Sequence, residues 1–126
     1  MCVLVRMKRR FRKGEVMAAE LASKTCVPCR GGGPPLKGAE LAKLQAQVDD
    51  AWKVVQEHHL IRIFPFPDFQ KALDFVNKVG AIAEEQGHHP DILLTWGRAD
   101  IKLFTHKIDG LTESDFILAA KIDELS

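Results

Sequence analysis

The sequence predicts an α+β fold, in which an antiparallel four-stranded sheet made of two hairpins carries three helices packed on one face. The 126 residues are enough for one domain with a hydrophobic core and too few for two. Apolar and polar residues follow patterns typical of helix, strand, strand, long helix, strand, strand and helix, in that order. The strands come in consecutive pairs, which favours hairpins over the strand–helix–strand units of parallel sheets.

The N-terminal part of the chain differs from the rest in composition. Six of the 18 Lys and Arg residues lie within the first 13 positions, and all 17 acidic residues follow them. Residues 25–38 are rich in Gly and Pro, which interrupt regular structure. We therefore expect residues 1–35 to be a basic extension and a flexible Gly/Pro-rich segment, and residues 36–126 to form a single α+β domain. Met17 resembles a natural start, so residues 1–16 are expected to have no role.

Composition also argues against several classes of protein. The chain is 46% hydrophobic and 28% charged, as in a soluble globular protein. No apolar run approaches the roughly 20 residues of a membrane-spanning helix, and we see no secretory signal. We expect a cytoplasmic protein with no membrane partner. The acidic balance after the basic extension argues against nucleic-acid binding by the domain. Three cysteines, an odd number, do not suggest a disulfide framework.

The first half of the domain is predicted to hold a short helix and a hairpin. Apolar residues recur at helical spacing over residues 40–51. Residues 52–57 and 60–66 are apolar, β-branched runs that predict two strands. His58 and His59 lie between these runs, and we interpret them as exposed polar residues of the hairpin turn.

A long helix is predicted from the N-cap residue Asp68 to Gln86. Gly87 suits the position just after a helix, and Pro90 prevents its continuation. The second hairpin is predicted from strands over residues 92–96 and 101–106, joined by a turn over residues 97–99.

The last helix is predicted to begin at a capping box formed by Thr112 and Asp115. The predicted register of the second hairpin pairs Trp96 with Asp100, and this register places His106 opposite Pro90. His106 is therefore expected beside the loop that follows the long helix. A shift of one residue would turn its side chain to the other face of the sheet.

Two further histidines, His88 and His89, follow the long helix directly. Glu84 lies one helical turn before His88 and is expected to contact its ring and fix its tautomer. The carbonyl end of the helix favours a positively charged imidazolium. Pro90 limits His89 to extended conformations. We predict that His88, His89, His106 and Glu84 converge in one cavity.

Several chemistries are open for this cluster. Three histidines around an open position are typical of catalytic zinc, although adjacent histidines seldom bind one ion together. Nucleophilic catalysis lacks a nearby Ser or Cys. Metal-free proton transfer between imidazoles suits dehydration or tautomerisation of an activated small molecule. A metal or thiol sensor at Cys26-Val-Pro-Cys29 is a separate hypothesis.

The spacing of these residues resembles the signature of the pterin-4a-carbinolamine dehydratase family. The resemblance extends from Leu36 to Leu125 in the order of the elements. The residues that carry it are Glu84-x-x-x-His88-His89-Pro90, Trp96, His106 and Asp115.

The resemblance implies dehydration of pterin-4a-carbinolamine (4a-hydroxytetrahydropterin) to quinonoid dihydropterin. This reaction recycles the pterin of an aromatic amino-acid hydroxylase and needs no metal or redox cofactor. By resemblance, His88 and His106 exchange protons with the C4a hydroxyl and N5 of the pterin, and Glu84 accompanies them. His89 mainly holds the pterin, and Trp96 forms a wall of its pocket.

The resemblance also implies a homodimer or homotetramer, with a sheet that continues across the dimer. Asp115 matches the family signature, but we interpret it as part of the helix cap, structural rather than chemical. The alternative function is that of a non-catalytic dimerisation or assembly factor on the same fold. The presence of all three histidines favours catalysis.

Overall fold

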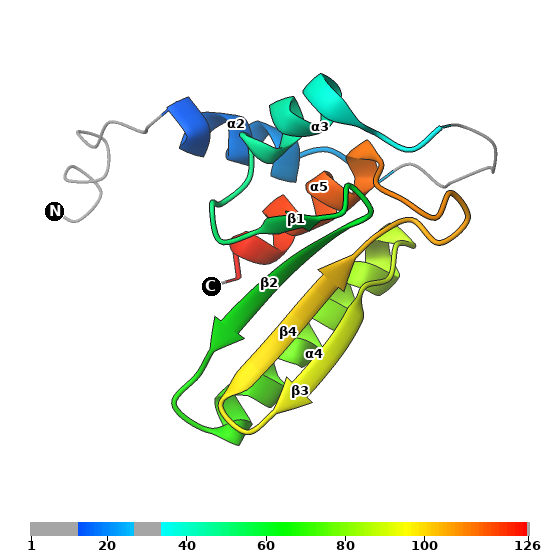
Figure 1. Ribbon diagram of the computed structural model, residues 1–126. Coiled ribbons are helices and arrows are strands. Elements are labelled where there is room, and N and C mark those ends of the chain that lie inside the picture. The colour runs from blue at the N-terminus through cyan, green and yellow to red at the C-terminus, as the bar shows by residue number, and fades with distance from the viewer. Residues whose placement is uncertain (1–12, 27–33, 126) are drawn as a thin grey trace, which may run out of the picture.

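The computed structural model describes residues 13–26 and 34–125. The strands of this part form one antiparallel sheet in the order β1-β2-β4-β3, in which β1 pairs with β2 and β3 with β4 (Figure 1). The predicted α+β fold with two hairpins is therefore confirmed. The described elements are α2 (Lys13–Ala22), α3 (Gly38–Gln45), β1 (Lys53–Val55), β2 (His59–Pro65), α4 (Phe69–Gln86), β3 (Asp91–Thr95), β4 (Arg98–Leu103) and α5 (Glu113–Asp123).

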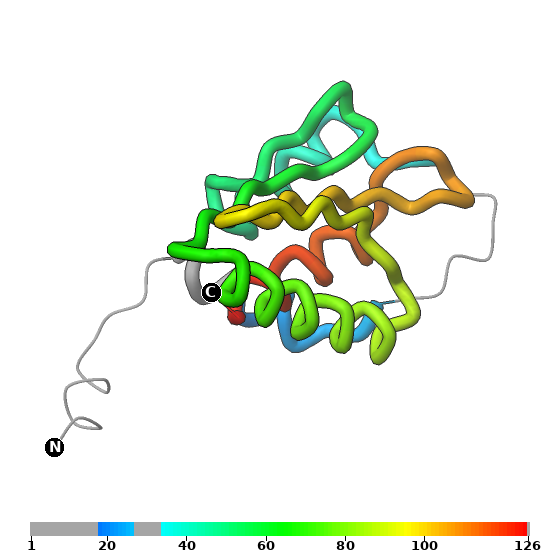
Figure 2. Tube along the Cα trace, turned by 90° about the horizontal axis from the view of Figure 1, so that it is seen from below, coloured from blue at the N-terminus to red at the C-terminus, as the bar shows by residue number. Residues whose placement is uncertain are grey.

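The core lies between the sheet and the helices α2, α4 and α5, which are on one side of it (Figure 2). Alternate residues of β4 are buried because successive side chains of a strand point to opposite faces. Its buried residues are Ala99, Ile101 and Leu103, and they pack with Leu60 and Phe64 of β2. The helix α5 is enclosed almost completely, since every residue from 114 to 120 is buried.

The helix α2 is an element that we did not predict. Leu21, Ala22 and the following Cys26 belong to the hydrophobic core, and Lys121 Nζ of α5 donates a hydrogen bond to the carbonyl oxygen of Ala22 at 2.7 Å. The core therefore begins before residue 36. The division of the chain into an extension and a domain stays a prediction, and residues 1–12 lie outside the described part.

The predicted helix ends are confirmed. The Asp68 carboxylate accepts a hydrogen bond from the backbone N–H of Lys71 at 2.8 Å and caps α4. Gly87 follows α4 with φ +64°, a left-handed conformation that glycine adopts without steric cost. Thr112 and Asp115 form the predicted capping box of α5.

The predicted register of the second hairpin is wrong by three residues. Thr95 lies opposite Arg98, and the turn between them has only two residues, Trp96 and Gly97. Gly97 has φ +74°, a left-handed conformation that glycine adopts readily at the third position of a tight four-residue turn. Trp96 is therefore part of the turn and does not pair with Asp100.

This shorter turn changes the place of His106. The strand β4 ends at Leu103, so His106 lies on the loop after the strand instead of opposite Pro90. A single bridge between Thr105 and Gly110 closes the loop that carries it.

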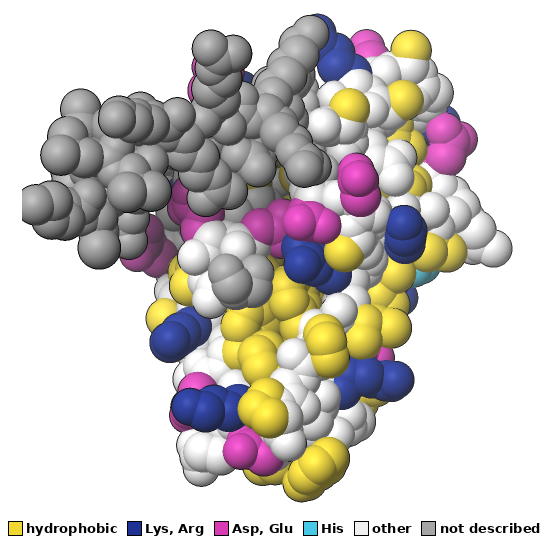
Figure 3. All heavy atoms as spheres, turned by 90° about the vertical axis from the view of Figure 1, so that its left-hand side faces the viewer, with side chains coloured by type: hydrophobic (Ala, Val, Ile, Leu, Met, Phe, Trp, Pro, Cys, Tyr) yellow, Lys and Arg dark blue, Asp and Glu magenta, His cyan; other side chains and the backbone are white. Residues whose placement is uncertain are grey.

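Some large hydrophobic side chains remain at the surface, and Figure 3 shows hydrophobic side chains gathered on one face. The most exposed large ones are Trp96 and Leu93 on the second hairpin, 73% and 54% exposed, with Ile63 and Phe69 near the end of β2 and the start of α4. An oligomer that covers such residues stays a prediction. None of the helices in the described ranges is long and apolar enough to span a lipid bilayer.

A charged cluster lies on the helix-facing side of β2, near the end of α5. Asp123 Oδ1 accepts hydrogen bonds from Arg62 Nη1 at 2.8 Å and from the indole N–H of Trp52 at 2.7 Å. Burial raises the pKa of Asp123 to about 6, although the Trp52 N–H and the Arg62 charge both act to lower it. The folded protein therefore holds a proton on Asp123 at pH values where the unfolded chain has lost it.

This difference predicts a pH-dependent stability. The stabilising contribution of protonated Asp123 is complete below about pH 4 and is lost as the pH rises through about 6. The free energy of unfolding of the wild type should fall by roughly 1–3 kcal/mol relative to that of Asp123→Asn over this range. Urea unfolding of both proteins from pH 4 to 7 measures the two free energies of unfolding. A difference between them that does not change with pH would contradict the prediction.

Candidate functional site

Three connections meet at one end of the sheet, and they carry most of the predicted site residues. They are the β1–β2 turn, the α4–β3 loop with His88 and His89, and the β4–α5 loop with His106 (Figure 1). The left-handed Gly87 directs the chain away from α4 just before the two histidines.

His88 is held by Asp115. Its Nε2 lies 2.6 Å from Asp115 Oδ1, and its side chain is only 14% exposed. A carboxylate only accepts hydrogen bonds, so Nε2 carries a proton and Nδ1 is the nitrogen left for other partners.

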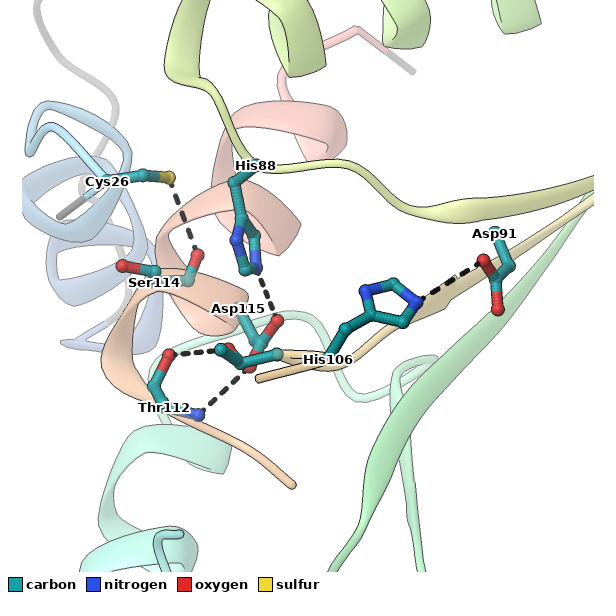
Figure 4. Close-up of polar contacts among 8 residues, drawn as sticks. Cys26, His88, Asp91, His106, Thr112, Ser114 and Asp115 are labelled. Carbon is teal, nitrogen blue, oxygen red and sulfur yellow. Dashed lines mark hydrogen bonds and ion pairs between the residues drawn. The ribbon is translucent and has the colours of Figure 1, made fainter. Parts of the chain in front are cut away.

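Asp115 is completely buried and accepts two further hydrogen bonds. Its Oδ2 accepts from Thr105 Oγ1 and from the backbone N–H of Thr112, both at 2.9 Å. Figure 4 shows the carboxylate between His88 and the backbone of Thr112. The interpretation of Asp115 as only a helix cap is therefore incomplete, because the same side chain orients His88.

His106 directly follows Thr105 in the chain, and its side chain faces Asp91 (Figure 4). Its Nε2 is 3.9 Å from Asp91 Oδ1, an ion-pair distance when the ring is protonated, and its side chain is 60% exposed. The α4–β3 and β4–α5 loops are thus linked twice, through Asp115 and through Asp91. These links bring His88 and His106 into one region of the surface.

The predicted contact between Glu84 and His88 is wrong. Glu84 Oε2 lies 2.7 Å from Nε2 of His89 instead. The spacing of one helical turn does not extend to His88, because α4 ends at Gln86 and Gly87 is left-handed. Both partners of the Glu84–His89 pair are mostly exposed, so the pair adds little stability.

Trp96 does not join the histidines within this chain. It lies in the β3–β4 turn, at the opposite end of the five-residue strand β3 from His88 and His89 (Figure 1). Such a strand is about 17 Å long. The predicted role of Trp96 as a wall of the same pocket is therefore wrong for a single subunit.

The interpretation of His58 and His59 as exposed turn residues is right only in placing His58 in the β1–β2 turn. Both are partly buried, and His59 is the first residue of β2, opposite Val55. His58 Nε2 bonds Asp109 Oδ1 at 2.7 Å, which connects the β1–β2 turn to the loop of His106.

Cys26 has the environment of an unreactive thiol. It is buried, its Sγ donates to the carbonyl oxygen of Ser114 at 3.5 Å, and burial raises the pKa of the thiol to about 11. Cys29 lies outside the described residues, so the hypothesis of a sensor at the Cys-x-x-Cys motif stays untested.

Within the described ranges, no three His, Cys, Asp or Glu side chains are placed to hold a metal ion together. A hollow of about 540 Å³ lies between α3 and β1 and contains none of the predicted site residues. It is lined by Ala42, Gln45, Ala46, Asp50, Trp52 and Lys53.

The arrangement supplies two imidazoles with different environments. His88 is nearly buried and fixed in one orientation, whereas His106 is open to solvent beside a carboxylate. Imidazole gains and loses a proton near neutral pH, so the pair suits general acid and base chemistry on a small molecule. The sequence did not predict that Asp91 pairs with His106 or that Thr105 donates to Asp115, although both residues stand within three residues of a predicted histidine.

Comparisons with known proteins show the family to which the chain is related. A family model described as "Pterin 4 alpha carbinolamine dehydratase" matches residues 34–125. A protein of Rubrobacter xylanophilus named "Putative pterin-4-alpha-carbinolamine dehydratase" is 65% identical over 107 residues, which cover 85% of this chain and 99% of that protein. A protein of Alkaliphilus metalliredigens with the same name is 53% identical over 104 residues, 82% of this chain and 94% of that protein.

Two solved structures share the fold. A crystal structure from Brucella melitensis, titled as a transcriptional coactivator/pterin dehydratase, has a TM-score of 0.67 and 30% identity, covering 72% of this chain and 97% of that one. A pterin dehydratase-like protein identified as a RuBisCO assembly factor in the alpha-carboxysome has a TM-score of 0.52 and 25% identity, covering 60% and 88%. On this sequence match and this fold, the chain belongs to the pterin-4-alpha-carbinolamine dehydratase family.

Proposed function

We propose that the protein dehydrates pterin-4a-carbinolamine to quinonoid dihydropterin by general acid and base catalysis from histidines. In this reaction the C4a–O bond breaks and the hydroxyl leaves as water after it gains a proton. N5 loses its hydrogen, and its electrons form the new N5=C4a double bond. One proton is given and one is taken, so the reaction needs neither an oxidant nor a reductant.

The hydrogen bond between His88 Nε2 and the buried Asp115 carboxylate is the observation that carries the proposal. A fixed ring with one open nitrogen is what proton transfer to or from a bound substrate requires. His106, on the loop tied to the same carboxylate through Thr105, supplies the second proton-transfer group.

We assign a binding role to His89, whose ring is exposed and turned toward Glu84. Glu84 then fixes the orientation of His89 and does not touch the reacting atoms. Recycling of the pterin of an aromatic amino-acid hydroxylase follows from the reaction, because such an enzyme releases this carbinolamine. Cytoplasmic location and a homo-oligomer are part of the same proposal.

The direct test is stopped-flow measurement of carbinolamine dehydration with and without the protein. His88→Ala and His106→Ala should each lower kcat by roughly 100-fold or more, because each removes a proton-transfer group. His89→Ala should raise KM more than it lowers kcat. Lys78→Ala, on the exposed side of α4, is the control and should behave as the wild type.

A wild-type protein that does not accelerate dehydration would overturn the proposal. That outcome would favour the alternative of an assembly factor, the description given to one of the solved relatives. Full turnover in His88→Ala or His106→Ala would remove that residue from the mechanism.

A second prediction separates the two roles of Asp115. Asp115→Asn should lower kcat roughly tenfold or more, because an amide no longer holds His88 as a carboxylate does. Thr112→Ala weakens the same helix cap by about 1 kcal/mol without touching His88. It should lower the melting temperature and keep kcat. Equal kcat values for Asp115→Asn and Thr112→Ala would show that Asp115 acts only as a cap.

The third prediction concerns metal. Proton transfer by imidazoles is complete without a metal ion, so treatment with EDTA followed by gel filtration should leave kcat unchanged. Loss of activity that Zn²⁺ restores would instead support the zinc hypothesis.

A further inference from the structure

The first histidine pair is not used by the proposed reaction, yet it contacts the loop of His106. The imidazole Nε2 of His58 donates to Asp109 Oδ1 at 2.7 Å. Asp109 has φ +54° and its backbone N–H donates to the carbonyl oxygen of His106. The hydrogen bond from His58 therefore reaches the backbone turn that begins at His106.

Phe104 makes a second connection between the two histidines. Its ring centroid is 4.8 Å from that of His58 and 4.2 Å from that of His106, with tilted planes in both contacts. Lys102 Nζ lies 5.4 Å from the same ring. One side of the mostly exposed His106 ring thus rests on Phe104, and Phe104 in turn rests on His58.

The ring of His58 is itself fixed at both nitrogens. Its Nδ1 lies 3.1 Å from Nδ1 of His59, so one of these nitrogens donates and the other accepts. Because Nε2 of His58 already donates to a carboxylate, neutral His58 accepts at Nδ1 from His59. Burial, followed by the charges of Lys102 and His58, lowers the pKa of His59.

We propose that His58 is a positioning residue, which orients the imidazole of His106 for proton transfer through Phe104 and Asp109. The inference rests on the proposed function, in which His106 exchanges a proton with the substrate. A group that is 60% exposed needs such support, because a misplacement of about 1 Å is enough to cost 100-fold in rate.

The first arm of the test uses NMR and needs no substrate. The ¹H–¹³C signal of His106 Cε1–Hε1 is assigned as the one missing from His106→Gln. Replacing Phe104 with Leu removes the ring current of Phe104 and therefore shifts the His106 signal. His58→Ala should shift the His106 signal in the same direction, because Phe104 then loses its contact with His58. Glu57→Ala is the matched control, because Glu57 is in the same turn but bonds the backbone of Gly38. It should leave the signal in place.

The second arm uses kinetics of the full chain. His58→Ala and Phe104→Leu should each lower kcat roughly tenfold with little change in KM. The double variant should be no slower than either single one, since both act through the same contact. His58→Gln keeps a donor for Asp109 and should recover most of the lost kcat, which also separates positioning from a general loss of folding.

The two arms separate this inference from the proposed function. A His106 signal that moves in Phe104→Leu but stays in place in His58→Ala overturns the inference even when dehydration is intact. Additive losses of kcat in the double variant overturn it as well. A wild type without dehydratase activity overturns the proposed function, and the movement of the NMR signal still decides whether His58 orients His106.

Discussion

The buried carboxylate of Asp115 is the group on which the arrangement of the site depends. A carboxylate with no exposure to water is costly unless its oxygens are hydrogen-bonded, and here three donors from different segments approach it. The donors are His88, Thr105, which directly precedes His106, and the backbone N–H of Thr112 at the start of α5. The cost of burying the charge is therefore offset only when the two loops and α5 are in their native places. The same hydrogen bonds therefore stabilise the fold and position the site.

Much of the fold was predictable because it follows local signals. The caps Asp68 and Gly87 and the capping box of α5 depend on residues close in sequence, and all were predicted. The helix α2 was missed because its stability comes from packing on α5, far away in the sequence. The predicted register of the second hairpin is wrong because it assumes a turn of three residues, whereas the turn has two. Glycine at the second turn position, Gly97, was the signal that favoured the shorter turn.

The site shows the same division between local and distant causes. The histidines His88 and His106 were identified from spacing, and the structure brings their loops together. The partner of His88 was predicted wrongly because helical spacing was extended past Gly87, where the helix has ended. Asp115 stands 27 residues after His88, and only the docking of α5 against the α4–β3 loop brings the two into contact. No local pattern encodes such a contact.

Asp115 both caps α5 and bonds His88, and this limits which residues can occupy position 115. Glutamate is the usual residue three positions after the N-cap in a capping box, and it closes a helix start as well as aspartate does. Its side chain is longer by one methylene group, which in a fully enclosed space would push the carboxylate out of line with the imidazole. A replacement that helix stability alone would tolerate is therefore closed to this protein, because the same acid has to close the start of α5 and hold His88.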